Sequence, residues 1–262
     1  MAGAGGARPE DHRLAADLAE GAGRLLLDIR ADLIERGADP VELRAEGDRR
    51  SHDWLMSELA RRAPGDAVLS EEGADDDARL GAERVWIVDP LDGTREFGEP
   101  PRGDWAVHVA LVVGGDPVAG AVALPAQRLT LATDPPAPPP REPSHRPRIL
   151  VSRTRPPALA AALAEALDGE LVAMGSAGAK VGAVVLGAAE VYAHAGGQYE
   201  WDSCAPVAVA RAAGFHASRI DGSPLRYNNA DPSLPDLLVC HPGLAERVAA
   251  VLADLAQRGG LG

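Results

Sequence analysis

Two aspartates in the segment Val85 to Phe97 have the types and spacing of a metal-binding turn. The segment reads VWIVDPLDGTREF, so Asp89 and Asp92 lie three residues apart, directly after four consecutive apolar residues. Pro90 and Gly93 favour a tight turn, and Pro90 is expected to end the hydrogen-bond ladder of the strand because it has no backbone N–H. Carboxylates that converge at the end of a rigid strand suit Mg²⁺. An acidic surface turn is the alternative interpretation.

Further polar residues lie where predicted elements begin or end. Glu71 follows a predicted strand, Asp202 directly precedes a predicted helix, and Asp48 lies at the start of another helix. Each of these acids alone is more often a helix cap or a surface charge, and Asp202 before Ser203 has the pattern of an N-cap region. Thr94 adds a hydroxyl directly after the aspartate turn. Their order along the chain favours the hypothesis that these residues form one shared site.

Composition limits the class of protein. The chain has 262 residues, of which 46% are hydrophobic and only 3% aromatic, so Ala, Val and Leu must build the core. A formal net charge of −13 argues against a general nucleic-acid binder, which needs a basic face. No apolar run reaches the length of a membrane span, and the first residues lack the apolar region of a signal peptide, so we expect a cytoplasmic protein. Cys204 and Cys240 are expected to be buried free thiols.

The first half of the chain is expected to form an α+β domain over residues 10–133, after a disordered tail over residues 1–9. Leucines at helical spacing predict a helix from Asp11 to about residue 36. A second helix is predicted over 48–62, and residues 41–47 are ambiguous, with an edge strand as one interpretation. Strands are predicted over 67–69, 85–88, 105–113, 118–124 and 129–132.

A segment with seven prolines, residues 134–147, is predicted to be an extended connector. Proline is disfavoured inside helices and sheets, so we place the domain boundary here. Alternating strand and helix patterns over 148–262 predict an α/β domain that completes the substrate site. The predicted strands are 148–152, 170–174, 191–194 and 237–240, and the predicted helices are 157–167, 179–186, 203–213 and 244–257.

Three motifs together resemble the inositol monophosphatase superfamily of Mg²⁺-dependent, lithium-sensitive phosphatases. They are SEE at 70–72, WIVDPLDGT at 86–94 and WDSCAPVAVARAAG at 201–214, and they match in type, order and rough spacing. The resemblance covers about residues 10–245 and implies the family's layered αβαβα sandwich. It also implies a site for roughly two or three Mg²⁺ ions. The ligands that it implies are Glu71, Asp89, the Leu91 carbonyl, Asp92 and Asp202.

The same resemblance implies catalytic and substrate-binding roles. Thr94 and Asp48 would orient and activate a metal-bound water, with Glu71 as a third catalytic residue. Thr94 alone could not deprotonate water, so it needs the metal and a carboxylate partner. Substrate binding is expected of Gly93, Thr94, Ser176, Lys180, Gly197, Arg226 and Tyr227.

One segment favours the CysQ-type 3′(2′),5′-bisphosphate nucleotidases, in their actinobacterial form, over inositol-selective members. GSAGAK at 175–180 resembles the GSSLK segment of those enzymes. It lies at a predicted strand-to-helix junction, where free N–H groups attract anions. Lys180 is the only lysine of the chain, and we interpret it as a second phosphate contact. A surface lysine is the alternative.

Two further segments, 194–202 and 221–229, are also similar to the nucleotidases. Gly197 would permit close approach of a ribose or base, and Arg226 or Tyr227 would pack against a purine. His108, on the strand after the aspartate turn, is better explained by core packing.

We therefore expect a Mg²⁺-dependent phosphomonoesterase that acts on the 3′-phosphate of adenosine 3′,5′-bisphosphate. The sulfated form, 3′-phosphoadenylyl sulfate, is a second expected substrate, which would place the enzyme in sulfur assimilation. Inositol monophosphatase or fructose-1,6-bisphosphatase activity is the alternative within the class. A catalytically inactive, metal-binding regulatory protein is the alternative from another class. Expected partners are a small nucleotide bisphosphate or sugar phosphate and a second copy of the chain in a homodimer, but no nucleic-acid polymer.

Overall fold

The computed structural model describes residues 6–154 and 158–257. Most of the expected N-terminal tail, residues 1–5, lies outside the described residues, and Pro9 already begins the first helix. None of the described helices is both long and apolar enough to cross a membrane. Cys204 and Cys240 are buried and free, as predicted.

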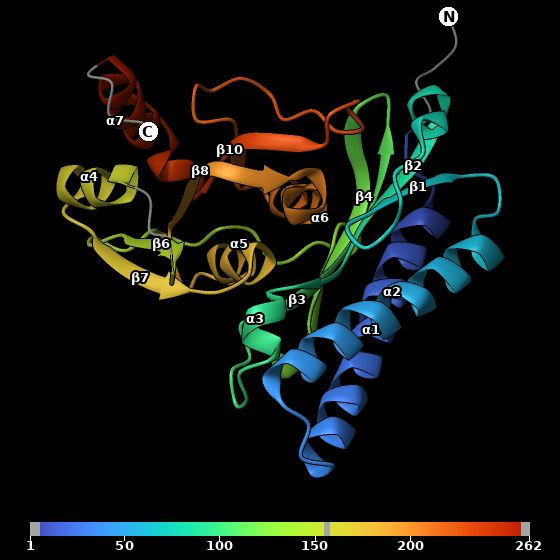
Figure 1. The fold of residues 1–262 in the computed structure, drawn as a ribbon. Coiled ribbons are helices and arrows are strands. Elements are labelled where there is room, and N and C mark those ends of the chain that lie inside the picture. The colour runs from blue at the N-terminus through green and yellow to red at the C-terminus, as the bar shows by residue number, and fades with distance from the viewer. Residues whose placement is uncertain (1–5, 155–157, 258–262) are drawn as a thin grey trace, which may run out of the picture.

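Two long helices, α1 (Pro9–Glu35) and α2 (Pro40–Arg62), pack against each other beside the first sheet (Figure 1). The interpretation of residues 41–47 as an ambiguous segment or edge strand is wrong, because they form the first turns of α2. The Asp39 carboxylate caps this helix by accepting hydrogen bonds from two backbone N–H groups of the first turn. Asp48 therefore lies inside α2 rather than at its start.

The first sheet has the strand order β1-β2-β3-β4-β5, with β1 and β2 parallel and the other pairs antiparallel. Alternate residues of β2 face opposite sides: Trp86 and Val88 pack with the α1 and α2 residues, and Val85 and Ile87 face the second half of the chain. Burial of both faces accounts for the unbroken apolar run. The strands are β1 (Ala67–Ser70), β2 (Arg84–Asp92), β3 (Ala106–Val113), β4 (Asp116–Leu124) and β5 (Leu129–Ala132).

The second sheet has the order β7-β6-β8-β10-β9. The predicted strands are present, but β8 continues to Tyr199 and β10 begins at Ser233, so both are longer than expected. The three-residue edge strand β9 was not predicted, because its residues carry no alternating apolar pattern. The strands are β6 (Arg148–Ser152), β7 (Glu170–Met174), β8 (Val191–Tyr199), β9 (His216–Ser218) and β10 (Ser233–Cys240).

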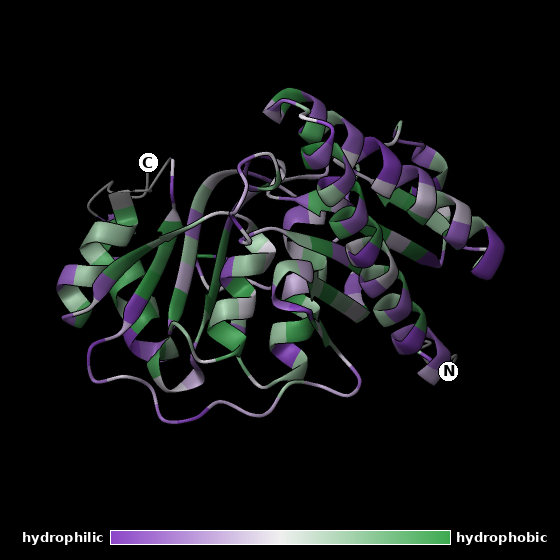
Figure 2. Cartoon of the chain, turned by 90° about the horizontal axis from the view of Figure 1, so that it is seen from below, coloured by the Kyte–Doolittle hydropathy of each residue, from purple (hydrophilic) through white to green (hydrophobic). Residues whose placement is uncertain are grey.

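The layers follow the predicted αβαβα order (Figure 1). Helices α1 and α2 cover the outer face of the first sheet, α5 and α6 lie between the two sheets, and α4 and α7 cover the outer face of the second. Figure 2 shows interior strands that are mainly hydrophobic and N-terminal helices with hydrophilic residues on their outer side. The remaining helices are the one-turn α3 (Thr94–Phe97), α4 (Ala158–Leu167), α5 (Ala177–Val185), α6 (Glu200–Ala212) and α7 (Ala245–Gln257).

The proline-rich segment, residues 134–147, contains no helix or strand, as its composition predicts. Its Ser144 N–H donates to the Glu190 carboxylate, and the Arg141 carbonyl contacts His241, so it is held along the second sheet. The largest hydrophobic cluster joins residues from both sides of this segment, including Ile87 and Val239. The two predicted domains therefore share a core, and the domain boundary stays a prediction.

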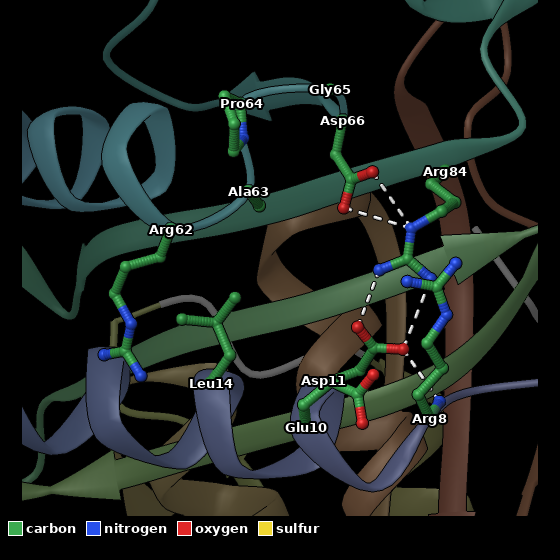
Figure 3. Close-up of a pocket in the computed structure, with 10 residues that line it drawn as sticks. All are labelled: Arg8, Glu10, Asp11, Leu14, Arg62, Ala63, Pro64, Gly65, Asp66 and Arg84. Carbon is green, nitrogen blue, oxygen red and sulfur yellow. Dashed lines mark hydrogen bonds and ion pairs between the residues drawn. The ribbon is translucent and has the colours of Figure 1, made fainter.

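An ion-pair network fastens α1 to the first sheet (Figure 3). Arg84, at the start of β2, pairs with Asp11 of α1 at 2.6 Å and with Asp66, just before β1, at 2.9 Å. The Trp86 indole N–H donates to the same Asp66 carboxylate. Arg84, Asp11 and Asp66 line a hollow of about 390 Å³, and they pair with one another across it.

Candidate active site

The aspartate turn lies at the end of β2. Regular pairing between β2 and β3 is interrupted between Asp89 and Asp92, where Pro90 lacks an N–H. The prediction that Pro90 ends the strand is wrong in part, because β2 resumes pairing at Asp92. Gly93 then adopts a left-handed conformation with φ of 87°, and its missing side chain leaves room for Ser176 and Trp105. This irregular end brings both carboxylates to the same place.

Asp202 joins the two aspartates from the middle layer. It is the third residue of α6 and accepts a 2.6 Å hydrogen bond from the backbone N–H of Tyr199, the N-cap residue. Asp202 therefore lies in the N-cap region, as its sequence pattern indicates, although the helix starts at Glu200, earlier than predicted. Ligand atoms of Asp89, Asp92 and Asp202 all lie within 4.8 Å of one another.

Crowding of like charges raises the pKa of part of this cluster. Burial, followed by the charges of Glu71, Asp92 and Asp202, raises the pKa of Asp89 well above its ordinary value. Burial and the charge of Asp92 raise the pKa of Asp202 to about 6. Glu71 follows β1, is exposed, and shares a hydrogen bond with the Asp89 carboxyl group. Asp89, Asp92 and Asp202 therefore converge, with Glu71 beside Asp89, and their role as metal ligands stays a prediction.

This donor set fits a hard divalent cation. Carboxylate oxygens within one cluster are the ligands that such cations prefer, and a bound cation would remove the repulsion that raises the pKa of Asp89 and Asp202. The buried Asp89 carboxylate has no cationic side chain closer than the His108 imidazole, at 4.0 Å, among the described ion pairs. A metal ion would supply the missing positive charge.

Thr94 and Asp48 form the predicted pair at the edge of this cluster. The Thr94 hydroxyl lies 3.0 Å from the Asp48 carboxylate and 3.0 Å from the Leu91 carbonyl, and its single proton serves one of these acceptors at a time. Burial raises the pKa of Asp48 to about 7, although the bond from Thr94 opposes this shift. A carboxylate with such a pKa can exchange a proton near neutral pH. The Leu91 carbonyl faces the same turn, and its role as a ligand stays a prediction.

The Asp92 carboxylate is held by donors from a different part of the chain. Its Oδ2 accepts hydrogen bonds from the Ser176 hydroxyl at 2.5 Å and the Gly178 backbone N–H at 2.6 Å. The His108 Nε2 lies 3.2 Å from the same oxygen. Burial alone would raise the pKa of Asp92, but the charge of His108 and these donors lower it to about 2. Ser176 is thus brought to the site, in contact with a predicted ligand.

Lys180 lies inside the protein and is only 5% exposed, so the surface-lysine alternative is wrong. Its ammonium group donates to the backbone carbonyls of Met174, Gly175 and Ser176 and lies over the Tyr192 ring. Three acceptors match its three N–H donors. Lys180 therefore holds the segment that contacts Asp92. Direct contact with a phosphate stays a prediction, and it would require one of these bonds to be exchanged.

A hollow of about 260 Å³ opens beside Thr94 and carries positive charge at its rim. Arg95 is exposed there, and Arg153 enters from the end of β6. Arg153 is held by ion pairs with Glu96 at 2.8 Å and Glu99 at 2.9 Å. The hollow is therefore a suitable entrance for an anionic substrate next to the carboxylate cluster.

The structure does not bring Tyr227 and Arg226 to this site. Tyr227 is buried, 2% exposed, and its hydroxyl contacts that of Ser203, so the prediction that its ring packs on a purine is wrong. Arg226 pairs with Asp116 beside the β3–β4 turn, at the end of β3 opposite to the site. Gly197 is exposed with open space around it and φ of 74°, near the start of α6. Its predicted approach to a ribose or base stays a prediction.

Two features at the site were missed. The exposed Tyr199 ring stacks on Trp201, with ring centres 4.8 Å apart, directly before Asp202. Two aromatic residues at positions i and i+2 were the available signal in the sequence. His108 was assigned to core packing, and it does lie in the core, yet it contacts Asp92 and α6. No pattern in its own strand indicates those contacts.

The chain belongs to the inositol monophosphatase family, whose profile matches residues 11–135 and 143–257. Members of this family are metal-dependent, in agreement with the carboxylate cluster.

Several named proteins are similar in sequence to this chain. The 3′-phosphoadenosine 5′-phosphate phosphatase of Mycobacterium tuberculosis is 51% identical over 242 residues, covering 89% of this chain and 90% of that protein. The Mycobacterium leprae protein of the same name is 48% identical over 260 residues, covering 94% and 95%. The 3′(2′),5′-bisphosphate nucleotidase CysQ of Escherichia coli K12 is 33% identical over 190 residues, covering 68% and 76%.

Solved structures agree on the fold. CysQ from Bacteroides thetaiotaomicron matches with a TM-score of 0.74 at 29% identity, covering 88% of this chain and 97% of that one. Inositol monophosphatase II from Staphylococcus aureus matches with a TM-score of 0.75 at 22% identity, covering 90% and 93%. The second likeness supports the fold alone.

Proposed function

We propose that this protein is a Mg²⁺-dependent phosphomonoesterase that removes the 3′-phosphate of adenosine 3′,5′-bisphosphate, giving AMP and phosphate. The observation that carries the proposal is the cluster of Asp89, Asp92 and Asp202 beside the Thr94–Asp48 pair. The relatives with nearly half or more of their residues identical are named for the same substrate. The first line of support concerns the chemistry of the site, and the second concerns the identity of the substrate.

The residues divide the chemistry between them. Asp89, Asp92 and Asp202, with Glu71 and the Leu91 carbonyl, would hold roughly two or three Mg²⁺ ions. Such ions, when bound, neutralise phosphate charge and lower the pKa of water.

Thr94 and Asp48 would act on the attacking water. The Thr94 hydroxyl would orient the water, and an Asp48 carboxylate oxygen would take its proton, since the pKa of Asp48 is about 7. The backbone N–H groups of Gly93 and Thr94 would bind the phosphate at the start of α3. Ser176 keeps Asp92 in place on the opposite side.

The residues at the rim of the site are suited to binding a nucleotide. The exposed face of the Tyr199 ring, stacked on Trp201, offers an adenine a planar apolar surface beside Asp202. Gly197 precedes this pair and leaves open space for a ribose. Arg95, which is exposed at the hollow beside Thr94, would attract the second phosphate. The same rim would accept 3′-phosphoadenylyl sulfate, giving adenylyl sulfate, and would place the enzyme in sulfur assimilation.

The test compares phosphate release with Mg²⁺ from adenosine 3′,5′-bisphosphate, inositol 1-phosphate and fructose 1,6-bisphosphate. We expect kcat/KM for the nucleotide to exceed the others by more than about a hundredfold, or about 2.7 kcal/mol of transition-state preference. Comparable values would favour the general sugar phosphatase. Release from none of the three would favour a metal-binding regulatory protein.

Three further properties remain part of this proposal. Lithium should inhibit the release of phosphate, sedimentation should show a homodimer, and cell fractionation should place the protein in the cytoplasm. A monomer, a lithium-insensitive enzyme or a membrane-bound fraction would contradict the respective property without affecting the assigned reaction.

A further inference from the structure

His108 connects the two halves of the carboxylate cluster. Its imidazole projects from β3, is fully buried, and has its Nδ1 2.9 Å from the Trp201 carbonyl in the first turn of α6. Its Nε2 lies 3.2 Å from Asp92 Oδ2 at the end of β2. One ring therefore contacts a predicted ligand on the first sheet and the residue directly before Asp202. The segments that it joins are about a hundred residues apart along the chain.

The contacts with Asp92 all involve one of its two oxygens. Ser176, Gly178 and His108 approach Oδ2, and no hydrogen bond within the described part of the chain reaches Oδ1. An oxygen that already accepts two hydrogen bonds, here from Ser176 and Gly178, is a poor ligand, because its lone pairs are engaged. The arrangement leaves Oδ1 available and sets the direction in which it points.

The surroundings leave the imidazole little freedom to move. A Cβ on Gly178 would lie 2.0 Å from His108 Nε2 and 3.0 Å from the Ala106 side chain, so only glycine allows α5 this close to β3. The acceptor at Nδ1 is a backbone carbonyl, which requires a proton on that nitrogen. The ring is thus fixed by packing and by one hydrogen bond, while its other nitrogen stays beside Asp92.

We propose that His108 is a positioning residue, which fixes Asp92 relative to Asp202 and directs Asp92 Oδ1 towards the metal ion. This inference rests on the proposed metal-dependent function. Groups next to metal ligands that orient them are worth about 10–100-fold in metal affinity. A positioning role differs from a packing role, because it depends on Nε2, the His108 nitrogen that faces Asp92.

Three substitutions at His108 distinguish the role of its Nε2 from that of its Nδ1. The amide of His108→Gln can reach the position of Nε2 beside Asp92, the amide of His108→Asn reaches only the position of Nδ1 beside Trp201, and His108→Ala reaches neither. His216→Gln, on the edge strand β9, is the matched control. Mn²⁺ affinity is measured by electron paramagnetic resonance, and folding by circular dichroism and melting temperature.

We expect His108→Asn and His108→Ala to weaken Mn²⁺ binding by about 10-fold or more, and His108→Gln to stay within about threefold of the wild type and the control. Wild-type affinity in all three variants would overturn the proposal. Equal loss in all three, in step with a lower melting temperature, would also overturn it, because that result indicates packing alone.

A second measurement uses the unmodified protein and is decisive if the variants do not fold. Imidazole ¹⁵N spectra are recorded while Mg²⁺ is added. The His108 Nε2 signal should shift as Asp92 binds the ion, and that of His241, beside the proline-rich segment, should not. An unchanged His108 signal at saturating Mg²⁺ would overturn the proposal. Because neither readout uses a substrate, failure of the assigned nucleotide reaction would remain distinguishable from failure of this inference.

Discussion

Asp92 is the residue at which the proposed metal binding and the supporting contacts meet. We predict that Asp92→Asn lowers kcat/KM by about 10²–10³-fold. The loss of one ligand charge weakens the stabilisation of transition-state charge by the metal, which is worth several kcal/mol. The fold should persist, since the amide oxygen can still accept from Ser176 and Gly178. Phosphate release and circular dichroism are the measurements, and Asp116→Asn, at an exposed ion pair, is the control. Near-normal turnover with Asp92→Asn would contradict the catalytic assignment.

Tyr199 tests how the base is recognised. We predict that Tyr199→Ala raises KM for adenosine 3′,5′-bisphosphate by about 5–10-fold, equivalent to about 1 kcal/mol of lost aromatic contact. The KM for inositol 1-phosphate should not change, because that substrate has no base to stack. Tyr199→Phe keeps the ring and should behave as the wild type. An equal effect on both substrates would instead indicate that Tyr199 supports α6.

At the scale of elements, the attachment of α1 to the first sheet should make stability sensitive to acid. Burial alone would raise the pKa of Asp11, but its bonds to Arg84 and to the Arg8 backbone hold it below its ordinary value. A carboxyl group whose pKa is lowered in the folded state stabilises the protein above its unfolded pKa of about 4, and this stabilisation is lost as pH falls through the lower value.

The corresponding prediction concerns the Asp11→Asn variant. Its urea midpoint should be lower than that of the wild type at pH 6, and the difference should shrink towards pH 3. Urea titrations at several pH values measure this, with Asp17→Asn as control because its pair with Arg62 is exposed. A difference that is constant over the whole pH range would show that Asp11 contributes packing rather than charge.

At the scale of the whole molecule, metal binding should stabilise the fold, since the proposed ligands come from the first sheet and the middle layer. A cation at a hundred times its Kd adds about 2.7 kcal/mol, or roughly 5–10 °C in melting temperature for a chain of this size. Because Asp202 has a pKa of about 6, its protonation at lower pH opposes metal binding. We therefore predict a larger shift with Mg²⁺ at pH 7.5 than at pH 5.5, measured by scanning calorimetry with EDTA as reference. Equal shifts at both pH values would contradict the participation of Asp202.

Much of the architecture follows from local pattern. The apolar run of β2, the strand-helix alternation of the second half and the Asp89–Asp92 turn are encoded by neighbours in the chain, so their structure could be predicted. Local pattern failed at residues 41–47, because there the capping of α2 by Asp39 decides the conformation and the side chains alone are ambiguous. The clustering of Asp89, Asp92 and Asp202 could be predicted because each lies near a predicted element boundary.

The sequence by itself determined which acids could bind a metal and where along the chain they lie. The tertiary structure alone decided which polar and aromatic residues face them. Tyr227 and Tyr199 lie in similar polar surroundings in the sequence, yet one is buried against Ser203 and the other is exposed beside Asp202. His108 contacts Trp201 only because distant segments pack together, whereas the carbonyl partners of Lys180 lie four to six residues before it and packing decides only its burial. Burial and contact are properties of that packing, and no short stretch of residues contains them.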